Sequence, residues 1–371
     1  MTTSLDKLIK NLSKAAKGVH IDVLANSLNY EVISTPAYDL NRILSGSLFG
    51  GLRTTKMTLI VGPEHSFKSS FMMLCSAAAQ KMGYTPVIIE TEGAYDVEFA
   101  ARWGVNVDNA IYAYAPLVSD VDILLNGLIE AEDDKFMICI DSIGGLFRRK
   151  VFDDMGGKEG TVRSAPTADQ GSLAKDIKTM LKTLAYTLIH KNSIAICAGH
   201  YYGNPSGYGD AEQIGGGKYV KLAPHYIISL KKSPIYENQG ESVSKRGRII
   251  GQEIKAITLK NRVYKPFQEA TIEINFEQGI NKYAGLLELA IRAGLITQGG
   301  AGWYTNNLTA DKVQGKENAE HWIKDTDMIK KIDEWLQSSG YSNINNSIKD
   351  IVETQDNLEE RQLKEDDESN G

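Results

Sequence analysis

The sequence predicts an α/β fold with a mostly parallel sheet, and three features of the chain indicate this class. Short apolar runs alternate with segments of helical composition between Met57 and Cys197. One run leads directly into a loop and a helix start, and two others lead into acidic residues. Buried strands that alternate with helices form parallel sheets covered on both faces. Ligands of such sheets bind at the carboxyl ends of the strands.

The elements follow one another in a simple order. A short amphipathic helix is expected over 4–16, where Leu5, Leu8 and Leu12 share one face and lysines the other. Such a helix either caps its own core or docks on a neighbouring subunit. Strands are expected over 57–61, 86–89, 110–114, 136–140 and 193–197, and helices over 71–81, 121–131 and 173–190.

Length and composition are typical of a soluble globular protein. A chain of 371 residues with 42% hydrophobic residues can bury one large core and a small second domain. Lysines interrupt the first segment and no run is long enough to span a membrane, so a cytoplasmic protein without membrane contact is expected. Cys75, Cys139 and Cys197 have no partners at metal-ligand spacing, which predicts buried free thiols.

The formal net charge of −6 resides in the C-terminal tail. Residues 352–371 contain eight acidic and two basic side chains, so the rest of the chain is neutral in sum. A neutral body can still present a basic groove, and the acidic total therefore does not exclude a nucleic-acid partner.

The loop after the first run has the spacing of a phosphate-binding P-loop. Backbone N–H groups at a helix start cradle phosphates, Lys68 supplies a point charge and the Ser69 hydroxyl completes a Mg²⁺ shell. Phe67 stands where Gly is usual, so this residue must hold an ordinary conformation or accept strain. The alternative is a βα turn with a chance Lys-Ser pair. The candidate nucleotide-binding residues are Gly62, Pro63, Glu64, His65, Ser66, Phe67, Lys68, Ser69 and Ser70.

Acidic residues follow two other apolar runs. Asp141 comes directly after 136–140 and fits the Mg²⁺-positioning acid of P-loop ATPases. Glu90 and Glu92 follow 86–89, and Glu92 is a candidate general base for an attacking water. Solvated acids at strand ends are the alternative, although their occurrence at successive ends favours a shared site.

Two irregular stretches carry the features of a surface for single-stranded nucleic acid. Glycines give mobility, aromatic rings stack on bases and cations bind phosphates, whereas the alternative is a pair of ordinary surface loops. The candidates in the first stretch, 148–167, are Arg148, Arg149 and Arg163. Those in the second stretch, 201–214, and directly after it are Tyr201, Tyr202, Tyr208, Gly215, Gly216, Gly217, Lys218 and Lys221.

Together these motifs resemble the RecA-type ATP-dependent DNA recombinases, and most closely the phage UvsX-like branch. The resemblance covers about 33–335 and rests on GPEHSFKSS, ETEGAYD, FMICIDS, CAGH, GGGK, KNR and GGAGWY, in that order. Phe67 departs from the bacterial pattern but resembles the phage branch. The resemblance implies a RecA-like P-loop ATPase core, a short N-terminal helical element and a small α+β C-terminal domain.

The resemblance also implies site roles. Lys68 and Ser69 would bind ATP and Mg²⁺, Asp141 would support the metal, and Glu92 would be the base for hydrolysis. These are the roles that the residue chemistry already indicates.

Further roles come from the resemblance alone. Asp96 and Phe99 match positions near the adenine, and His200 matches the γ-phosphate sensor, where a neutral imidazole can donate one hydrogen bond. Lys260 and Arg262 match cations that reach the ATP of the neighbouring subunit; the alternative is a pair of exposed charges after a strand.

The expected organisation has four parts. These are an N-terminal helix and polymerisation segment over 1–34, an ATPase core with two DNA-binding loops over 35–275, a small domain over 276–340 and an acidic flexible tail over 341–371.

The predicted function is DNA-dependent ATP hydrolysis coupled to homologous pairing and strand exchange, in helical homo-oligomeric filaments on single-stranded DNA. Double-stranded DNA, a single-strand-binding protein and a loading mediator are expected partners, and the host cytoplasm is the expected location for a phage protein. Two alternatives stay open: a hexameric RecA-fold helicase, and a nucleotide-gated DNA-binding mediator without turnover.

Overall fold

A computed structural model of the chain describes residues 4–16, 21, 30–93, 95–132, 135–149, 170–203, 212–238 and 247–338. The chain forms two compact units. The first unit comprises Met1–Ser34 and Leu52–Leu230, and the second comprises Thr35–Gly51 and Lys231–Gly371. The predicted tail over 341–371 lies outside the described residues. The predicted four-part domain division stays a prediction.

The first unit is built on a parallel sheet with the strand order β9-β3-β7-β6-β4-β5. The strands are β3 (Met57–Gly62), β4 (Thr85–Glu90), β5 (Ile111–Tyr114), β6 (Phe136–Asp141), β7 (Ile194–Gly203) and β9 (Tyr226–Tyr236), which continues into the second unit. A short strand, β8 (Glu212–Ile214), pairs antiparallel with the end of β7. This parallel sheet with its intervening helices confirms the α/β class that the sequence predicts.

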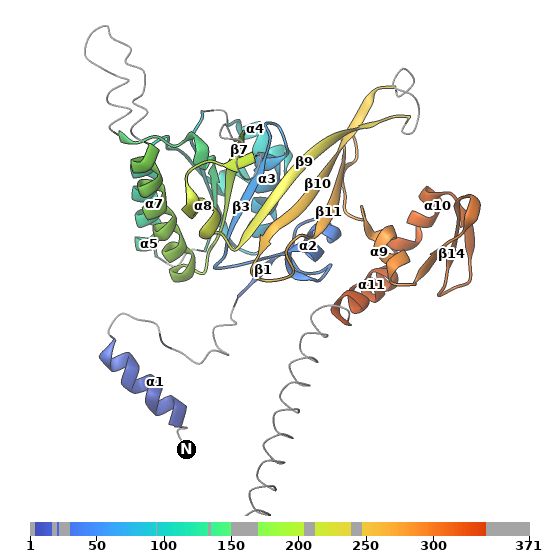
Figure 1. Cartoon of the computed structure of the whole chain (residues 1–371), viewed down its shortest axis with the longest axis horizontal. Helices are drawn as coiled ribbons and strands as arrows, with labels where there is room; N and C mark the ends of the chain where they lie inside the picture. The colour runs from blue at the N-terminus through green and yellow to red at the C-terminus, as the bar shows by residue number, and fades with distance from the viewer. Residues whose placement is uncertain are drawn as a thin grey trace, which may run out of the picture. The chain divides into compact units, whose positions relative to one another are not determined.

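Helices cover the sheet because its strands are apolar on both faces. The helix α5 (Val118–Glu130) packs beside α7 (Gln170–His190), and one core contains apolar side chains of both helices together with Leu59, Ile138 and Cys197 of the strands (Figure 1). The alternate strand residues, such as Ile60 and Ile88, are also buried, and α3 (Lys68–Gln80) contacts the same strands. Burial of both faces is typical of a parallel sheet and explains the near-continuous apolar runs.

The remaining elements of the first unit are short. They are α1 (Ser4–Ala15), β1 (Val32–Ile33), β2 (Leu52–Arg53), α4 (Val97–Arg102), η2 (Val107–Asn109), η3 (Ile143–Gly145) and α8 (Lys218–Leu222). The predicted N-terminal helix is present, and its face of Leu5, Leu8 and Leu12 is exposed in the single chain. The three thiols, Cys75, Cys139 and Cys197, are buried and free, as predicted.

The second unit contains an antiparallel ladder and a small helical and β-strand region. The ladder is formed by β10 (Ile249–Asn261), β11 (Glu269–Asn275) and β12 (Gly279–Asn281), and α2 (Tyr38–Ser45) contacts β10 and β11. The small region contains α9 (Leu286–Arg292), β13 (Ile296–Gln298), η6 (Gly300–Gly302), β14 (Trp303–Asn306), β15 (Lys312–Gln314), α10 (Lys316–Glu320), η7 (Trp322–Lys324) and α11 (Thr326–Ser338). Its sheet, β13-β14-β15, is antiparallel. The apolar core of this region includes Leu289 and Ile332 together with Leu48, which follows α2.

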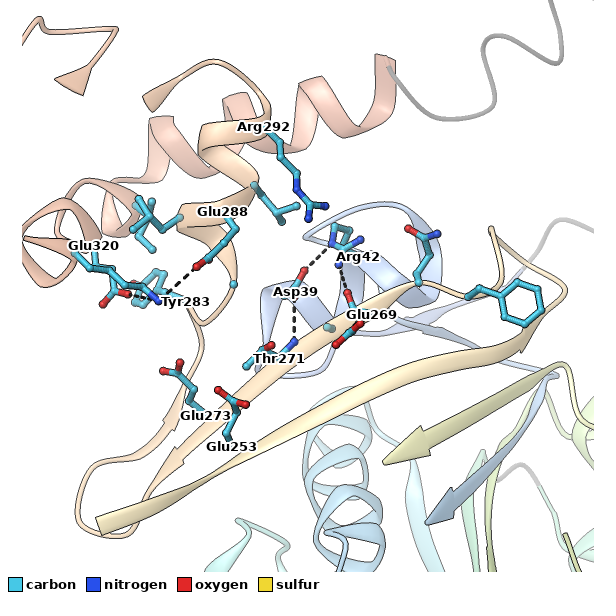
Figure 2. A pocket seen from close by; sticks show the side chains of 18 residues that line it. Asp39, Arg42, Glu253, Glu269, Thr271, Glu273, Tyr283, Glu288, Arg292 and Glu320 are labelled. Carbon is cyan, nitrogen blue, oxygen red and sulfur yellow. Dashed lines mark hydrogen bonds and ion pairs between the residues drawn. The ribbon is translucent and has the colours of Figure 1, made fainter. Parts of the chain in front are cut away.

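A cavity of about 520 Å³ lies in the second unit, and ion pairs line its walls (Figure 2). Arg42 Nε donates to Asp39 Oδ1 at 2.6 Å within α2, and the amide of Thr271 donates to Asp39 Oδ2 at 3.2 Å, so the second bond joins α2 to β11. Burial raises the pKa of Asp39 even though Arg42 lowers it. Lys316 lies 3.4 Å from Glu288 and 3.7 Å from Glu320, and the first of these pairs joins α9 to α10. The charges of this wall therefore stabilise the packing of neighbouring elements.

No helix among the described residues combines the length and apolar character needed to cross a bilayer.

Candidate active site

The carboxyl ends of neighbouring strands bring the predicted site residues together. Gly62 at the end of β3 is in register with His200 of β7, and Glu90 at the end of β4 is in register with Asp141 of β6. Parallel strands end at the same edge of a sheet, so residues far apart in the chain meet there. The P-loop begins at this edge.

The backbone of Phe67 is strained rather than in an ordinary conformation. Its φ of 77° lies in the left-handed region, which costs a non-glycine residue about 1–2 kcal/mol. The residue is only 7% exposed, and its ring lies edge-on to Trp103 with ring centroids 5.3 Å apart. Burial of the ring offsets the backbone strain. A buried aromatic residue with a left-handed backbone therefore occupies the position where the motif usually has Gly.

Lys68 is the first residue of α3 and lies inside the loop. Its Nζ donates to the carbonyl oxygens of Gly62 at 3.0 Å and Pro63 at 2.7 Å, and lies 3.4 Å from Ser66 Oγ. Burial lowers the pKa of Lys68, and the nearby carboxylates, Asp141 first, partly offset this effect. An anion in the loop would be a stronger partner for the ammonium than these neutral carbonyl groups.

Ser69 and Asp141 are directly hydrogen-bonded. Ser69 Oγ donates to Asp141 Oδ2 at 2.5 Å. Burial raises the pKa of Asp141 and Glu92 raises it further, whereas the Ser69 hydrogen bond, Lys68 and His200 lower it. A cation bound beside Asp141 would favour the ionised form of this buried carboxyl group.

Glu92 projects from the turn after β4 toward β6 and β7. Its side chain is 51% exposed, Oε1 accepts from Ser142 Oγ at 2.9 Å, and Oε1 lies 3.7 Å from His200 Nε2. Gly145 gives this side chain room, because a Cβ there would overlap Thr91 and lie 3.2 Å from Glu92 Oε1. Ser142 ends the FMICIDS motif, but neither it nor Gly145 was predicted as a site residue, since a small residue after a strand end does not by itself indicate a catalytic role.

Phe99 lies on α4, and Asp96 directly precedes this helix. The Asp96 side chain caps this helix, because Oδ1 accepts from the amide of Glu98 at 3.0 Å. The Phe99 ring lies 6.5 Å from the Trp103 ring, which in turn contacts Phe67. An aromatic cluster thus connects α4 to the P-loop. Trp103 was also missed by sequence reasoning, because it belongs to no motif.

Lys260 and Arg262 lie in the second unit at the end of β10. Asn261 between them is 8% exposed and donates through Nδ2 to the carbonyls of Ile43 and Leu44. Its Oδ1 accepts from the amides of Val263 and Tyr264, each at 2.8 Å. This buried amide fixes the turn that carries both cations. Burial lowers the pKa of Lys260, and the charge of Arg262 lowers it further.

The candidate DNA-binding residues are only partly described. Arg163, Tyr208 and the side chain of Tyr202 lie outside the described residues. Arg148 Nε donates to Asp176 Oδ2 at 2.6 Å, and Arg149 is exposed. Tyr201 packs against the core and donates to Ser229 Oγ at 3.2 Å. A role for these residues in DNA binding stays a prediction.

The glycine turn after β8 leads into α8. Gly216 and Gly217 both have φ of 88°, and a Cβ at Gly217 would lie 2.9 Å from Ala174 of α7. Gly215 is close to β7, where its amide donates to the His200 carbonyl at 3.5 Å. Lys218 and Lys221 are exposed on the short helix that follows.

The sheet, the P-loop and the acids at its edge define an α/β protein of the P-loop class. The sequence matches the family model described as the RecA N-terminal domain over residues 3–281, so the chain belongs to the RecA family. The protein is accordingly an ATP-dependent recombinase that forms filaments on single-stranded DNA and performs strand exchange, and it is a DNA-dependent ATPase. The predicted family and function are thereby confirmed at the level of RecA.

Proposed function

We propose that the site at the carboxyl ends of β3, β4, β6 and β7 hydrolyses ATP with the residues predicted for it. The observation that carries the proposal is the continuous set of contacts at this edge. Ser69 lies 2.5 Å from Asp141, and Glu92 lies 2.9 Å from Ser142 and 3.7 Å from His200. A charge for phosphates, oxygen ligands for a metal and a candidate base therefore lie in one site.

Mg²⁺ is the proposed metal, and the residues present fit it. This ion is bound by one or two protein oxygens together with phosphate oxygens and water, so a large cluster of ligands is not needed. Ser69 and Asp141 would hold it, because their side-chain oxygens lie side by side, with Ser69 Oγ 2.5 Å from Asp141 Oδ2. When bound, the ion neutralises negative charge on the β and γ phosphates.

The protein groups have distinct proposed roles. Lys68 binds the β and γ phosphates, and its displacement from the Gly62 and Pro63 carbonyls accompanies this binding. Glu92 orients the attacking water and accepts its proton, while Ser142 limits the rotation of the carboxylate. His200 donates a hydrogen bond to the γ phosphate. Phe99, which belongs to the aromatic cluster, stacks on the adenine, and the Asp96 carboxylate accepts a hydrogen bond from its amino group.

Assembly would complete the site. Lys260 and Arg262 are proposed to act on the ATP of the neighbouring subunit, where cations stabilise transition-state charge. The rigid turn around Asn261 supports this role because it fixes the backbone of both cations.

The finer identity is also a proposal. We place the chain in the phage UvsX-like branch, on the basis of Phe67 and the order of its motifs. Segments 148–167 and 201–214 would bind single- and double-stranded DNA. A single-strand-binding protein and a loading mediator would act with it in the host cytoplasm.

The proposal predicts that hydrolysis needs both Mg²⁺ and DNA. Purified full-length protein should hydrolyse ATP faster when single-stranded DNA is added, and chelation by EDTA should abolish turnover until Mg²⁺ is restored. Steady-state ATPase assays and electron microscopy of filaments measure both effects. DNA-stimulated turnover that persists in EDTA would contradict the Mg²⁺ assignment. Filaments without any turnover would favour the DNA-binding mediator.

Action in trans predicts complementation between two inactive variants. One variant carries Lys68→Ala, and the other carries Lys260→Ala with Arg262→Ala. Mixed filaments contain some interfaces with an intact P-loop facing intact cations, so the equimolar mixture should regain part of the parent turnover. Each variant assayed alone is the control. Mixtures that co-assemble but stay inactive would count against action on the neighbour's nucleotide.

A further inference from the structure

Glu90, the last residue of β4, folds its side chain back onto the turn that carries Glu92. Glu90 is 2% exposed. Its Oε1 accepts from the amide of Glu92 at 2.8 Å, and its Oε2 accepts from the amide of Gly93 at 2.6 Å. A carboxylate that accepts two backbone N–H groups forms charge-assisted hydrogen bonds, which are stronger than neutral ones.

We propose that Glu90 is a positioning residue for hydrolysis, acting through the placement of Glu92. This inference rests on the proposed role of Glu92 as the base. Glu90 itself does not contact the reacting atoms. It fixes the backbone from which the Glu92 side chain leaves the sheet edge.

The need for such a residue follows from the exposure of Glu92. Its side chain is 51% exposed, and the polar contacts described for its carboxylate are Ser142 at 2.9 Å and His200 at 3.7 Å. A base on a flexible side chain must be held within about 0.5 Å of its productive position. Ser142 restrains only the carboxylate of Glu92. The hydrogen bonds from the amides of Glu92 and Gly93 to Glu90 restrain its backbone.

The start of the same turn is hydrogen-bonded to the end of β6. These bonds form a second set of contacts beside those made by Glu90. The amide of Thr91 donates to the Asp141 carbonyl at 3.0 Å, and Thr91 Oγ1 accepts from the amide of Ser142 at 3.0 Å. Thr91 thus ties the start of the turn to the neighbouring strand, while Glu90 binds its two following amides. The same short segment presents Glu92 and the end of β6, so the two sets of contacts together set the distance between base and metal site.

The chemistry of the position requires a carboxylate. An ionised Glu offers two acceptor oxygens, whereas Gln offers one oxygen and an NH₂ group that would face a backbone donor. Asp keeps both oxygens but is one methylene shorter. The Tyr112 hydroxyl of β5 also donates to Glu90 Oε2 at 3.4 Å, which restrains the carboxylate from its outer side.

Glu90→Gln should therefore lower kcat for DNA-stimulated hydrolysis by about 10- to 100-fold, the size of effect seen when an orienting partner is removed. The affinity for ATP should stay within about twofold of the parent, because the P-loop contacts are unchanged. Glu90→Asp should give an intermediate kcat. The full chain is assayed with saturating single-stranded DNA, and ATP affinity is measured with a fluorescent ATP analogue.

A double-mutant cycle separates positioning from a general structural role. If Glu90 acts through Glu92, the double variant Glu90→Gln, Glu92→Gln should be no slower than Glu92→Gln alone, within about twofold. Multiplied losses in the double variant, or a parent kcat in Glu90→Gln, would overturn the inference. If Glu90→Gln does not fold, the same cycle is carried out with Glu90→Asp.

Asp39→Asn provides a matched control for the loss of a buried carboxylate. Asp39 also accepts from a backbone amide and lies in the second unit, away from the P-loop in the chain. It should lower thermal stability without lowering kcat at temperatures where the protein stays folded. The test of Glu92 as the base is distinct from the test of Glu90. Hydrolysis at the parent rate in Glu92→Gln would refute the proposed function rather than the inference about Glu90.

Discussion

Glu92→Gln is expected to lower the rate of DNA-stimulated ATP hydrolysis by about 10²- to 10⁴-fold, the usual contribution of a general base. This corresponds to about 3 to 5 kcal/mol of transition-state stabilisation. Gln keeps the size of the side chain and an oxygen that can accept from Ser142 Oγ, which lies 2.9 Å from Oε1 in the parent. It cannot accept a proton from water. Single-turnover hydrolysis with radiolabelled ATP measures the loss.

ATP binding should survive in this variant, since Glu92 makes no contact with the P-loop backbone in the described structure. Filaments on single-stranded DNA should therefore persist longer than those of the parent after dilution, because hydrolysis no longer releases them. Electron microscopy at fixed times after dilution gives this lifetime. Parent-rate hydrolysis in Glu92→Gln would exclude Glu92 as the base.

Lys68→Ala is expected to reduce turnover by about 10²- to 10³-fold, as when one preorganised electrostatic donor is removed. It should also weaken ATP binding, in contrast to Glu92→Gln. The physical reason is that the ammonium binds phosphate charge in both the bound and the transition state. Equilibrium titration with a fluorescent ATP analogue, together with the hydrolysis rate, separates the two effects.

Lys68→Arg is the matched control for charge. Lys68 Nζ fits between the carbonyls of Gly62 and Pro63 at 3.0 and 2.7 Å, where a planar guanidinium has a different shape and reach. Lys68→Arg should fold like the parent protein, but its rate of ATP hydrolysis should be little higher than that of Lys68→Ala. Normal ATP affinity and turnover in Lys68→Ala would refute the role of this residue in the P-loop.

The strands were predictable because their residues carry a strong signal of their own. Two buried faces require near-continuous apolar runs, and the expected strands at 57–61 and 136–140 correspond to β3 and β6 within one residue. The helix starts were predicted less well: α5 and α7 each begin three residues before the predicted start, whereas α3 begins at Lys68, where the P-loop spacing places a helix start. Phe67 and Leu117, which precede α3 and α5, provide no side-chain cap, so no Ser, Thr or Asp marked the beginning.

The sequence alone determined which residue types stand at the strand ends, and with them the P-loop, the acids and the family motifs. Strand order and register decided that Asp141 lies opposite Glu90 and that Ser69 reaches Asp141. The left-handed backbone of Phe67 and its burial against Trp103 were likewise decided by tertiary packing, since the sequence left strain and ordinary geometry equally open. Glu90 is the clearest case. In the sequence Glu90 is only one more acidic residue at the end of a strand. Its two hydrogen bonds to the turn form because the folded chain buries its side chain beneath the amides of Glu92 and Gly93.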